Sequence, residues 1–300
     1  MPGASKTVLV TGIHGFTGRY MQAELSSAGY CVVGLGSNPS TDANYQQADL
    51  LDPGSLKQVL RDIQPDLVVH LAAVAFVGHD DANAFYQVNL LGTRNLLEAI
   101  TSMGKTPDCI LLASSANIYG NASEGLLNET TPPAPANDYA VSKLAMEYMA
   151  SLYRNKLPIV ITRPFNYTGV GQANDFLIPK IVGHFIAKAP VIELGNLDVW
   201  RDFGDVRSVV QTYRSLLETP AARGQTINVC TGQTHSLREI IDLCTQITGH
   251  SMQVQVNPSF VRANEVKILC GNNTRLQSLV GKQAFKPLHD TLQWMLSPNQ

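Results

Sequence analysis

Residues 7–18, TVLVTGIHGFTG, carry the strongest structural signal in this 300-residue chain. The apolar run at residues 7–11 predicts a buried strand, and a helical pattern begins at Phe16. Glycines at positions 12, 15 and 18 permit a tight turn and let backbone N–H groups approach a phosphate at the start of the helix. Glycine-rich turns also occur for structural reasons, but this one has the required strand–helix context. The stretch therefore predicts a site for the pyrophosphate of a dinucleotide.

The rest of the first half repeats this alternation of short apolar runs and helical patterns. Strands are expected at residues 7–11, 30–35, 67–71, 110–114 and 159–163, and helices at 16–28, 53–63, 84–103 and 139–155. Such alternation is typical of a parallel sheet covered by helical crossovers. We therefore predict an α/β fold with a Rossmann-type doubly wound parallel sheet.

Local signals support two of these boundaries. Asp52 suits the N-cap of the helix at 53–63, and Pro53 suits its first turn. Prolines at positions 132, 133 and 135 exclude a helix or a central strand over residues 130–138. We expect that segment to be a loop that leads into the helix at 139–155.

The alternation changes after residue 163, where a loop rich in Gly, Asn and Thr begins. Helices are then expected at 176–187, 206–217, 237–248 and 288–296, and strands at 191–194, 226–229 and 254–256. We predict a dinucleotide-binding domain at 1–165, completed by about 195–230, and a smaller C-terminal substrate-binding lobe formed mainly by 166–300. Ligands of open α/β sheets bind beyond the carboxyl ends of the strands, so we expect the site between these two parts.

The composition is that of a compact enzyme, with 15% charged residues, 44% hydrophobic residues and a net charge of −2. This balance argues against a nucleic-acid-binding protein and against an acidic disordered chain. No apolar run approaches the roughly 18 residues of a membrane span, and no signal-peptide core is recognised. The five cysteines are scattered and the seven histidines show no ligand spacing. We therefore expect reduced thiols, no metal site and a cytoplasmic location.

The end of the second strand bears on which dinucleotide binds. An NAD site usually has an acidic residue there that accepts hydrogen bonds from the adenosine ribose, but residues 36–39 are GSNP. Ser37 and Asn38 can donate to a 2′-phosphate, with Arg19 near them at the helix start, so NADPH is favoured over NADH. Arg19 can equally be a solvated helix residue. Asp49 is a candidate for contact with adenine, or it caps a turn.

The segment YAVSK at residues 139–143 indicates the chemistry. Tyr139 and Lys143 lie on one face of any helix that contains them, and an ammonium group stabilises the ionised form of a nearby phenol. Ser115 ends the strand at 110–114 and would meet this pair at the carboxyl edge of the sheet, where it can orient a carbonyl. A Tyr-x-x-x-Lys pair alone is commonly a surface feature. Together with the phosphate loop, the pair predicts that Tyr139 donates a proton while hydride reaches the carbonyl carbon.

With these motifs the chain resembles, nearly end to end, an extended short-chain dehydrogenase/reductase that acts on nucleotide sugars. The resemblance implies a catalytic triad of Ser115, Tyr139 and Lys143. It places Asn89 behind the triad, where the alternative is a polar residue on an exposed helix stripe. The cofactor-binding residues that it implies are Gly12, His14, Gly15, Phe16, Thr17, Gly18, Arg19, Ser37, Asn38, Asp49, Leu50, Leu71, Ala72, Ala73, Tyr139, Lys143, Arg163 and Phe165.

Segments of the second half resemble the substrate-binding elements of this family. Residues 163–169, RPFNYTG, resemble a loop that contacts nicotinamide and substrate, while 199–206 and 262–266 resemble elements that hold a GDP-sugar. The planar fork of arginine matches diphosphate oxygens, although each arginine alone is more often a surface residue. The substrate-binding residues so implied are Asn117, Asn166, Lys180, Arg201, Arg262 and Glu265.

The similarity is to GDP-mannose 4,6-dehydratases and, more closely, to GDP-4-keto-6-deoxy-mannose reductases. A dehydratase of this family has an acidic residue two positions before its Tyr119 equivalent, where this chain has Asn117. The resemblance therefore implies NADPH-dependent reduction of the C4 ketone of a GDP-4-keto-6-deoxy sugar, hexose or heptose. The product would be a GDP-6-deoxy sugar, such as GDP-D-rhamnose, for surface polysaccharide, including lipopolysaccharide O-antigen. An NAD-dependent 4-epimerase, a 4,6-dehydratase and a non-enzymatic NADP-binding regulator stay open.

The helical patterns at 84–103 and 139–155 are apolar on more than one face. One face of each can pack on the sheet, and the remaining apolar surface needs another cover. We predict a homodimer whose interface is a bundle of these two helices from each subunit. The alternative is that the smaller lobe covers them.

Overall fold

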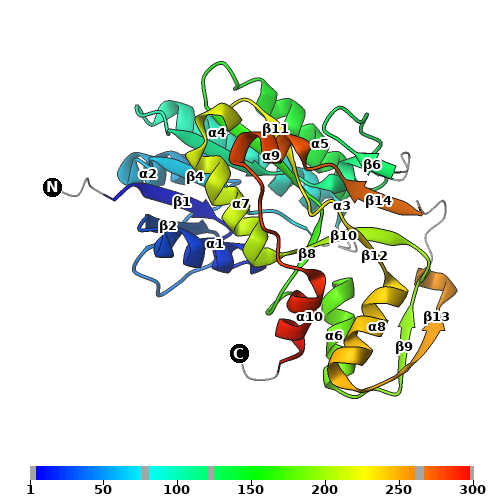
Figure 1. Ribbon diagram of the computed structural model, residues 1–300. Coiled ribbons are helices and arrows are strands. Elements are labelled where there is room, and N and C mark those ends of the chain that lie inside the picture. The colour runs from blue at the N-terminus through cyan, green and yellow to red at the C-terminus, as the bar shows by residue number, and fades with distance from the viewer. Residues whose placement is uncertain (1–4, 76–80, 121–124, 261–266, 298–300) are drawn as a thin grey trace.

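The computed structural model describes residues 5–75, 81–120, 125–260 and 267–297. Its centre is a seven-stranded parallel sheet with the strand order β11–β7–β5–β4–β1–β2–β3 (Figure 1). The strands are β1 Thr7–Thr11, β2 Cys31–Gly36, β3 Tyr45–Gln47, β4 Leu67–His70, β5 Cys109–Ala113, β7 Ile159–Pro164 and β11 Thr226–Val229. The chain changes direction across the sheet between β1 and β4, which is the position where open sheets of this kind bind ligands.

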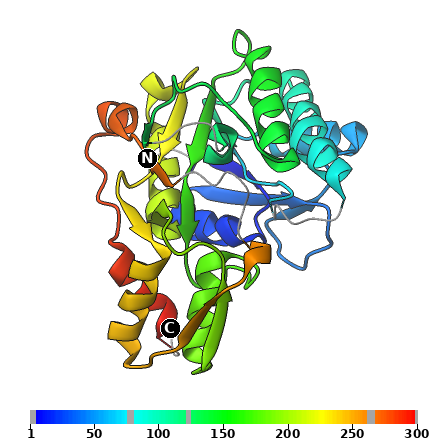
Figure 2. The same cartoon turned by 90° about the vertical axis from the view of Figure 1, so that its right-hand side faces the viewer.

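Helices cover both faces of this sheet (Figure 2). The first layer contains α1 Phe16–Ser27 and α7 Val206–Glu218, and the second contains α2 Pro53–Ile63, α4 Thr93–Ser102 and α5 Asp138–Ser151. Successive side chains of β1 point to opposite layers, because Val8 and Val10 pack with the first and Leu9 packs with the second. The predicted doubly wound α/β fold is confirmed.

Side-chain caps fix the starts of two helices that position the site. The Asp52 carboxylate accepts the N–H groups of Gly54 and Ser55 at 3.0 and 3.2 Å, as the sequence predicts for the start of α2. The Asn137 side chain accepts the N–H of Ala140 at 2.9 Å at the start of α5. The proline-containing segment before α5 is a loop, as predicted.

The single helix predicted at residues 84–103 is wrong in its regularity. The structure has a short helix α3 Ala82–Ala84, a π-helix η1 Phe85–Gly92, and then α4. The Thr93 hydroxyl donates to the carbonyl of Asn89 at 2.7 Å, and the Asn89 side chain bonds outside the helix. A π-turn widens the helix locally and often marks a functional site.

The second half builds a smaller lobe beside the sheet, which forms the lower part of Figures 1 and 2. Its core lies among α6 Leu177–Ile186, α8 Leu237–Thr248, α10 Leu288–Leu296 and the parallel pair β9 Val191–Leu194 and β13 Gln253–Val256. A small sheet connects it to the main body through β6 Gly125–Leu127, β8 Asn166–Thr168, β10 Trp200–Asp205, β12 Thr234–Ser236 and β14 Ile268–Gly271. The helix α9 Thr274–Val280 packs near β11 and α7.

The chain leaves the main sheet after β7 and returns to it at β11. The strand β11 pairs with β7 in parallel, and α7 packs against α1. This agrees in outline with a dinucleotide-binding part that later residues complete, while the residue limits of the two predicted domains stay a prediction.

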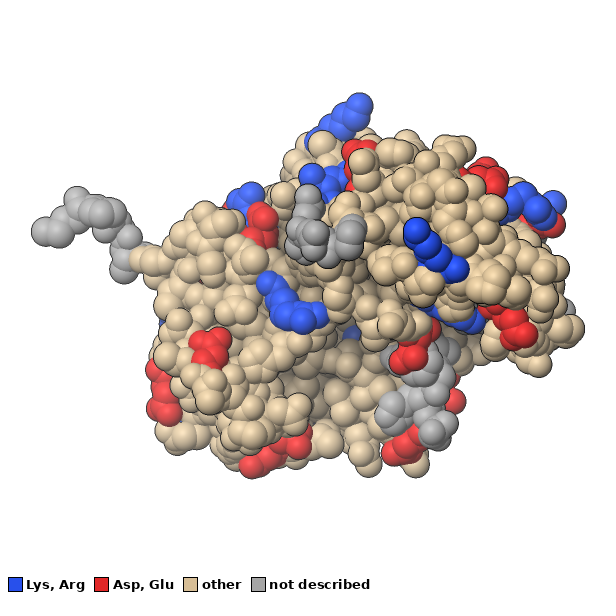
Figure 3. Space-filling model, turned by 90° about the horizontal axis from the view of Figure 1, so that it is seen from below, with Lys and Arg blue, Asp and Glu red and all other residues tan. Residues whose placement is uncertain are grey.

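The surface carries few charges. Figure 3 shows Lys and Arg scattered singly among Asp and Glu on the face seen from below, over a mostly uncharged surface. Among the described helices, none is long and apolar enough to cross a bilayer.

Candidate active site

The glycines of the first loop are required by close contacts. Gly12 has φ +71°, and a Cβ there would lie 2.8 Å from the backbone N of Ala72. A Cβ at Gly18 would lie 2.2 Å from the carbonyl O of Gly12, so α1 packs directly on the loop. Gly15 is the N-cap of α1 and provides no side-chain cap. The first N–H groups of the helix are therefore available to an anion, since helix N-termini attract negative charge.

A cleft of about 440 Å³ opens beside this loop, at the reversal point between β1 and β4. Predicted cofactor residues that line it are Gly12, His14, Gly15, Ser37, Asn38, Asp49, Leu50, Leu71, Ala72 and Ala73. The lining also contains Ile13, Leu35, Gly36, Tyr45, Ala48, Val74 and Val88, which sequence reasoning did not assign. These residues come from four adjacent strands, β4, β1, β2 and β3, from the segments that follow them, and from η1, so long-range packing brings them together.

The end of β2 is held by two side chains from β3. Tyr45 donates to the carbonyl of Asn38 at 2.6 Å, and Gln47 donates to the carbonyl of Ser37 at 2.9 Å. The Tyr45 ring also stacks on His14, with 4.7 Å between ring centroids. These bonds hold the backbone of Ser37 and Asn38, two residues with neutral polar side chains, at the cleft.

The acidic residue in the cleft lining, Asp49, accepts the N–H of Leu51 at 2.9 Å and so caps a turn. A glycine cradle, an uncapped helix start and neutral polar groups at the end of β2 fit the pyrophosphate and adenosine of a dinucleotide.

Four predicted cofactor residues of α1, Phe16, Thr17, Gly18 and Arg19, lie outside the cleft lining. The Arg19 guanidinium donates to the carbonyl of Gly171 at 3.0 Å, so it contacts the loop after β8. The Thr17 and Tyr167 hydroxyls bond each other at 2.8 Å, and the Phe16 ring stacks on Tyr167. These contacts connect the start of α1 to the loop that leads into the smaller lobe.

The predicted triad residues come together where β5 ends and α5 begins. Ser115 follows β5, its hydroxyl accepts the N–H of Asn117 at 3.1 Å, and it lies close enough to Tyr139 to affect the ionisation of that phenol. The Lys143 amine donates to the carbonyl of Ala113 at 2.8 Å. All three side chains are buried, with exposures of 5 to 8%. The strand end and the helix therefore meet as the sequence analysis expects.

Burial dominates the ionisation of this group. Desolvation raises the pKa of Tyr139 to about 12, against the opposing effect of the nearby Ser115 hydroxyl. Desolvation also lowers the pKa of Lys143 to about 8, although the charge of Glu147 raises it. At neutral pH the phenol is protonated and the amine carries a charge, which is the state needed for proton donation to a carbonyl oxygen.

Asn89 joins the cleft to the triad helix. Its side chain accepts the N–H of Val74 at 2.9 Å and donates to the carbonyl of the same residue at 3.1 Å. It also donates to the Ser142 hydroxyl at 3.0 Å, and that hydroxyl donates to the carbonyl of Tyr139. The π-helix thus presents one buried amide to the cleft wall and to α5.

A second buried chain of hydrogen bonds passes through His70. The Thr93 hydroxyl donates to Asn89, so it accepts from Nε2–H of His70 at 2.8 Å. Nδ1 of His70 then accepts from the Thr11 hydroxyl at 2.7 Å, and that oxygen accepts the N–H of Ala72. Desolvation and the nearby Lys143 charge lower the pKa of His70 to about 3, so the ring is neutral. It connects the glycine loop to η1.

The structure gives Arg163 and Phe165 other surroundings than the predicted cofactor contacts. The Arg163 guanidinium forms a buried ion pair with Glu147 at 2.7 Å and lies outside the cleft lining. Phe165 is buried with Ile118 and Tyr119. The sequence motif at 163–169 would suit either a cofactor contact or buried packing. In the structure the Arg163 guanidinium is used in the ion pair with Glu147 on α5.

The predicted substrate residues that the structure describes lie on four different elements around the connecting sheet. Asn117 is exposed next to Ser115, and Asn166 donates to the carbonyl of Asp202 at 3.5 Å. Arg201 donates to the carbonyls of Trp200 and Lys267. The Lys180 amine lies over the ring of Phe260 at 4.6 Å. The predicted substrate residues Arg262 and Glu265 lie outside the described residues.

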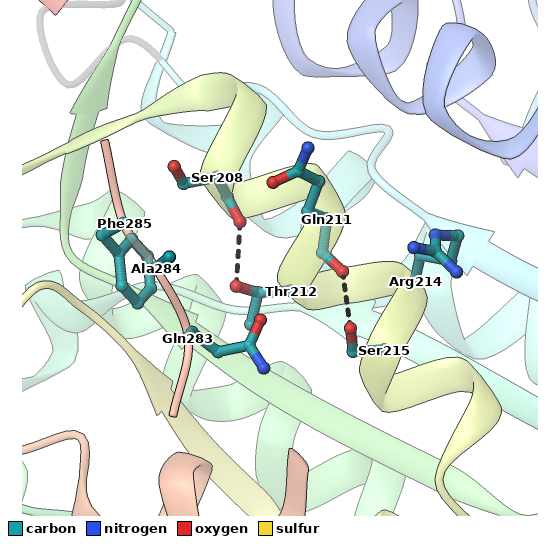
Figure 4. Close-up of a pocket in the computed structure, with 8 residues that line it drawn as sticks. All are labelled: Ser208, Gln211, Thr212, Arg214, Ser215, Gln283, Ala284 and Phe285. Atoms are coloured by element: carbon teal, nitrogen blue, oxygen red, sulfur yellow. Dashed lines mark hydrogen bonds between the residues drawn. The ribbon is translucent and has the colours of Figure 1, made fainter. Parts of the chain in front are cut away.

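A second hollow, of about 260 Å³, lies between α7 and residues 283–285 (Figure 4). The Thr212 hydroxyl donates to the carbonyl of Ser208, and the Ser215 hydroxyl donates to that of Gln211, so both are bonded within the helix. Arg214 is paired with Glu24 and with another carboxylate of α7. We therefore assign the chemistry to the first cleft.

The fold, the glycine loop and the Ser–Tyr–Lys group define an extended short-chain dehydrogenase/reductase. Residues 9–295 match the family model described as GDP-mannose 4,6 dehydratase. The chain belongs to this GDP-mannose 4,6-dehydratase family.

Two curated relatives show where the chain falls within that family. A GDP-6-deoxy-D-talose 4-dehydrogenase from Aggregatibacter actinomycetemcomitans is 39% identical over 233 residues, which cover 78% of this chain and 79% of that protein. A GDP-6-deoxy-D-mannose reductase from Pseudomonas aeruginosa is 33% identical over 304 aligned positions, which cover 98% of this chain and 97% of that protein. The prediction of a family of NAD(P)-dependent nucleotide-sugar enzymes is confirmed.

Solved structures share the whole fold. A putative epimerase from Burkholderia cenocepacia is 49% identical with a TM-score of 0.92, and each chain is covered to 97%. The protein RMD from Pseudomonas aeruginosa, solved with NADPH, is 32% identical with a TM-score of 0.86 over 97% of this chain and 96% of that one.

Proposed function

We propose that this protein uses NADPH to reduce the C4 ketone of a GDP-4-keto-6-deoxy sugar. The observation that carries the proposal is the buried group of Ser115, Tyr139 and Lys143, which Asn89 connects to a cleft that fits a dinucleotide. The named GDP-6-deoxy sugar oxidoreductases among its relatives support the substrate class.

The coenzyme would lie with its pyrophosphate on Gly12 and Gly15 and its adenosine near Ser37 and Asn38. When bound, it supplies the hydride for the carbonyl carbon. The neutral donors at the end of β2 favour NADPH over NADH, and the NADPH complex of the relative RMD supports the same choice. Whether a 2′-phosphate is preferred in this chain is part of the test below.

The reduction needs one proton, which the protein delivers. Ser115 donates a hydrogen bond to the substrate carbonyl, and the Tyr139 phenol transfers its proton to that oxygen as it becomes an alcohol. The charge of Lys143 stabilises the phenolate that is left until a proton is regained from solvent. Asn117 offers an amide and no acid or base, which disfavours a dehydratase.

The second candidate is a nucleotide-sugar 4-epimerase, favoured by the name of the Burkholderia cenocepacia structure. An epimerase returns the hydride to the sugar and keeps its coenzyme oxidised over a full cycle. Net consumption of NADPH separates the two.

We further propose a cytoplasmic homodimer that makes a GDP-6-deoxy hexose or heptose, such as GDP-D-rhamnose, for surface polysaccharide. Support for the dimer comes from the exposed apolar side chains of Leu91, Val141, Tyr148 and Leu152 on η1, on α5 and at its end. The smaller lobe leaves them uncovered.

The assay incubates the protein with GDP-4-keto-6-deoxy-mannose and either NADPH or NADH. We expect absorbance at 340 nm to fall faster with NADPH, and we expect a GDP-6-deoxy hexose by mass spectrometry. A second arm uses the corresponding heptose. Absence of turnover with either sugar and either coenzyme would overturn the proposal.

The control is Tyr139→Phe, which keeps the ring and removes the proton donor. We expect kcat to fall by about 100-fold or more, with NADPH binding unchanged by fluorescence titration. A variant with full activity would exclude Tyr139 as the acid.

A further inference from the structure

The most buried ion pair among the described residues joins Glu147 and Arg163 and takes no direct part in the proposed proton transfer. Glu147 and Arg163 are 7 and 8% exposed, and three bonds join them, at 2.7 Å from Nη2 to Oε2 and at 3.0 and 3.3 Å from Nε to Oε1 and Oε2. Burying two charges costs desolvation energy, and replacing such a pair with apolar residues often leaves stability unchanged or raises it. A role other than stability is therefore worth seeking.

The position of Glu147 connects it to the triad. It lies four residues after Lys143 on α5, so both side chains lie on one face of the helix, as Tyr139 does. Its carboxylate also accepts the Ser114 hydroxyl, and Ser114 directly precedes Ser115. One carboxylate thus contacts both elements that carry the triad.

Arg163 extends this contact to the remaining strands. Its Nη1 donates to the Tyr119 hydroxyl at 3.0 Å, and that hydroxyl donates to Asn228 at 2.7 Å. Tyr119 lies in the turn that begins at Ser115, and Asn228 lies on β11. The hydrogen bonds of this pair therefore connect α5 and β7 to the end of β5 and, through Tyr119, to β11.

We propose that Glu147 is a positioning residue of the proposed reductase: held by Arg163 and Ser114, it anchors the turn of α5 that carries Lys143 and places a negative charge one helical turn from that amine. This inference rests on the proposed function. The ion pair would then act in catalysis, and its burial would not require a gain in stability.

The charged and titratable groups around Lys143 are consistent with this role. They are Tyr139 and Glu147 on α5, His70 on β4 and Arg163 on β7. His70 is neutral and Tyr139 is protonated, so neither offers a negative charge at neutral pH. Burial works against the charged amine, and Glu147 works for it.

The test measures the titration of Lys143 directly. Protein labelled with 13C-lysine reports each amine through its Cε chemical shift, and Lys143→Arg identifies the signal. The first variant is Glu147→Gln. The second combines Glu147→Gln with Arg163→Met, so that no buried guanidinium is left without a partner. Glu98→Gln, which breaks the exposed pair with Arg94, is the matched control.

We expect the Lys143 midpoint to fall by about one pH unit in Glu147→Gln, a tenfold change in the ionisation equilibrium, and to stay unchanged in Glu98→Gln. In the double variant the fall should be smaller, because loss of the Arg163 charge acts in the opposite direction. If Glu147→Gln alone does not fold, the double variant decides. An unchanged midpoint in the double variant would leave the pair a structural feature and overturn the proposal. A charge-retaining Glu147→Asp variant should restore the midpoint.

The kinetic arm separates this inference from the proposed function. In an active enzyme, the alkaline fall of kcat/KM should shift to lower pH by the same amount as the Lys143 midpoint. If wild-type protein turns over no GDP-4-keto-6-deoxy sugar, the proposed function fails while the titration still tests Glu147.

Discussion

At the scale of single residues, burial sets the chemistry of the site. Tyr139 and Lys143 are taken out of water by the same packing that joins α5 to β5, and their pKa values move in opposite directions, to about 12 and about 8. Ser115 is the polar contact of the phenol. The acid is therefore reliably protonated, and the lysine becomes the group that titrates in the physiological range.

The pH dependence of the reaction follows from these shifts. Lys143 is charged below its pKa of about 8 and loses the charge above it, so kcat/KM for reduction should be level from pH 6 to 7.5. Above pH 8 it should fall, approaching tenfold per pH unit. Initial rates at limiting substrate from pH 5.5 to 10 measure this. A fall that begins only above pH 10 would assign the limb to another group.

His70 should make the fold sensitive to acid. Its pKa is lowered from 6.5 to about 3 by burial, so between these values the unfolded chain takes up a proton that the folded chain does not. The contribution of neutral His70 to the free energy of unfolding is therefore fully present above pH 6.5. Below that pH it declines, by up to about 1.4 kcal/mol per pH unit.

The measurement is the urea-unfolding free energy at pH 7.5, 6.0 and 5.0. His70→Gln should show a shallower decline than wild type, and His289→Gln, at an exposed position, should match wild type. Equal slopes in wild type and His70→Gln would mean that the ring is protonated in the folded protein.

At the level of elements, a substitution in the glycine loop can weaken coenzyme binding without a large loss of stability. A Cβ at Gly15 would meet one protein atom, the carbonyl O of Gly12 at 3.1 Å, and would otherwise enter the cleft. Gly15→Ala should therefore weaken NADPH binding by tenfold or more, about 1.4 kcal/mol, with little change in Tm. Gly183→Ala, in α6 with no atom within 4 Å of its Cβ, is the control and should keep full binding. Normal coenzyme affinity in Gly15→Ala would place the pyrophosphate elsewhere.

Most large elements follow from local sequence, and several boundaries match to the residue. The strand Thr7–Thr11 and the helix Pro53–Ile63 agree because a strong apolar pattern and a cap coincide there. The three-residue strands β3, β6, β8 and β12 were missed, because so short a run carries no periodicity. The π-helix was missed because its cause is the hydrogen bonding of Asn89 and Thr93 to distant partners.

The candidate site was predicted in the same uneven way. Ten of the predicted cofactor residues line the cleft because the glycine loop and strand ends are local signals. Arg163 differs because its partner, Glu147, lies 16 positions away on another element. Tyr45 was not foreseen, since its stacking on His14 depends on how β3 adds to the sheet.

At the scale of the whole molecule, an uncovered apolar face predicts self-association. Tyr148 and Leu152 are 65 and 78% exposed, and Leu91 on the neighbouring η1 is 46% exposed. Apolar surface of this kind marks interfaces. The 32.5 kDa chain should sediment as a dimer at micromolar concentration, and Tyr148→Glu with Leu152→Glu should shift it toward monomer. Ile186→Glu, at an exposed position of the smaller lobe, is the control. A monomeric wild type would contradict the four-helix interface.

The central claim is net hydride transfer to the C4 carbon of the sugar, and isotopic labelling tests it most directly. The protein is incubated with NADPH that carries deuterium at the transferable position and with GDP-4-keto-6-deoxy-mannose, and the product is examined by NMR. The account predicts one deuterium, at C4, with one NADPH consumed for each product molecule. A product without deuterium, or a changed sugar without loss of NADPH, would contradict it and indicate epimerisation or dehydration instead.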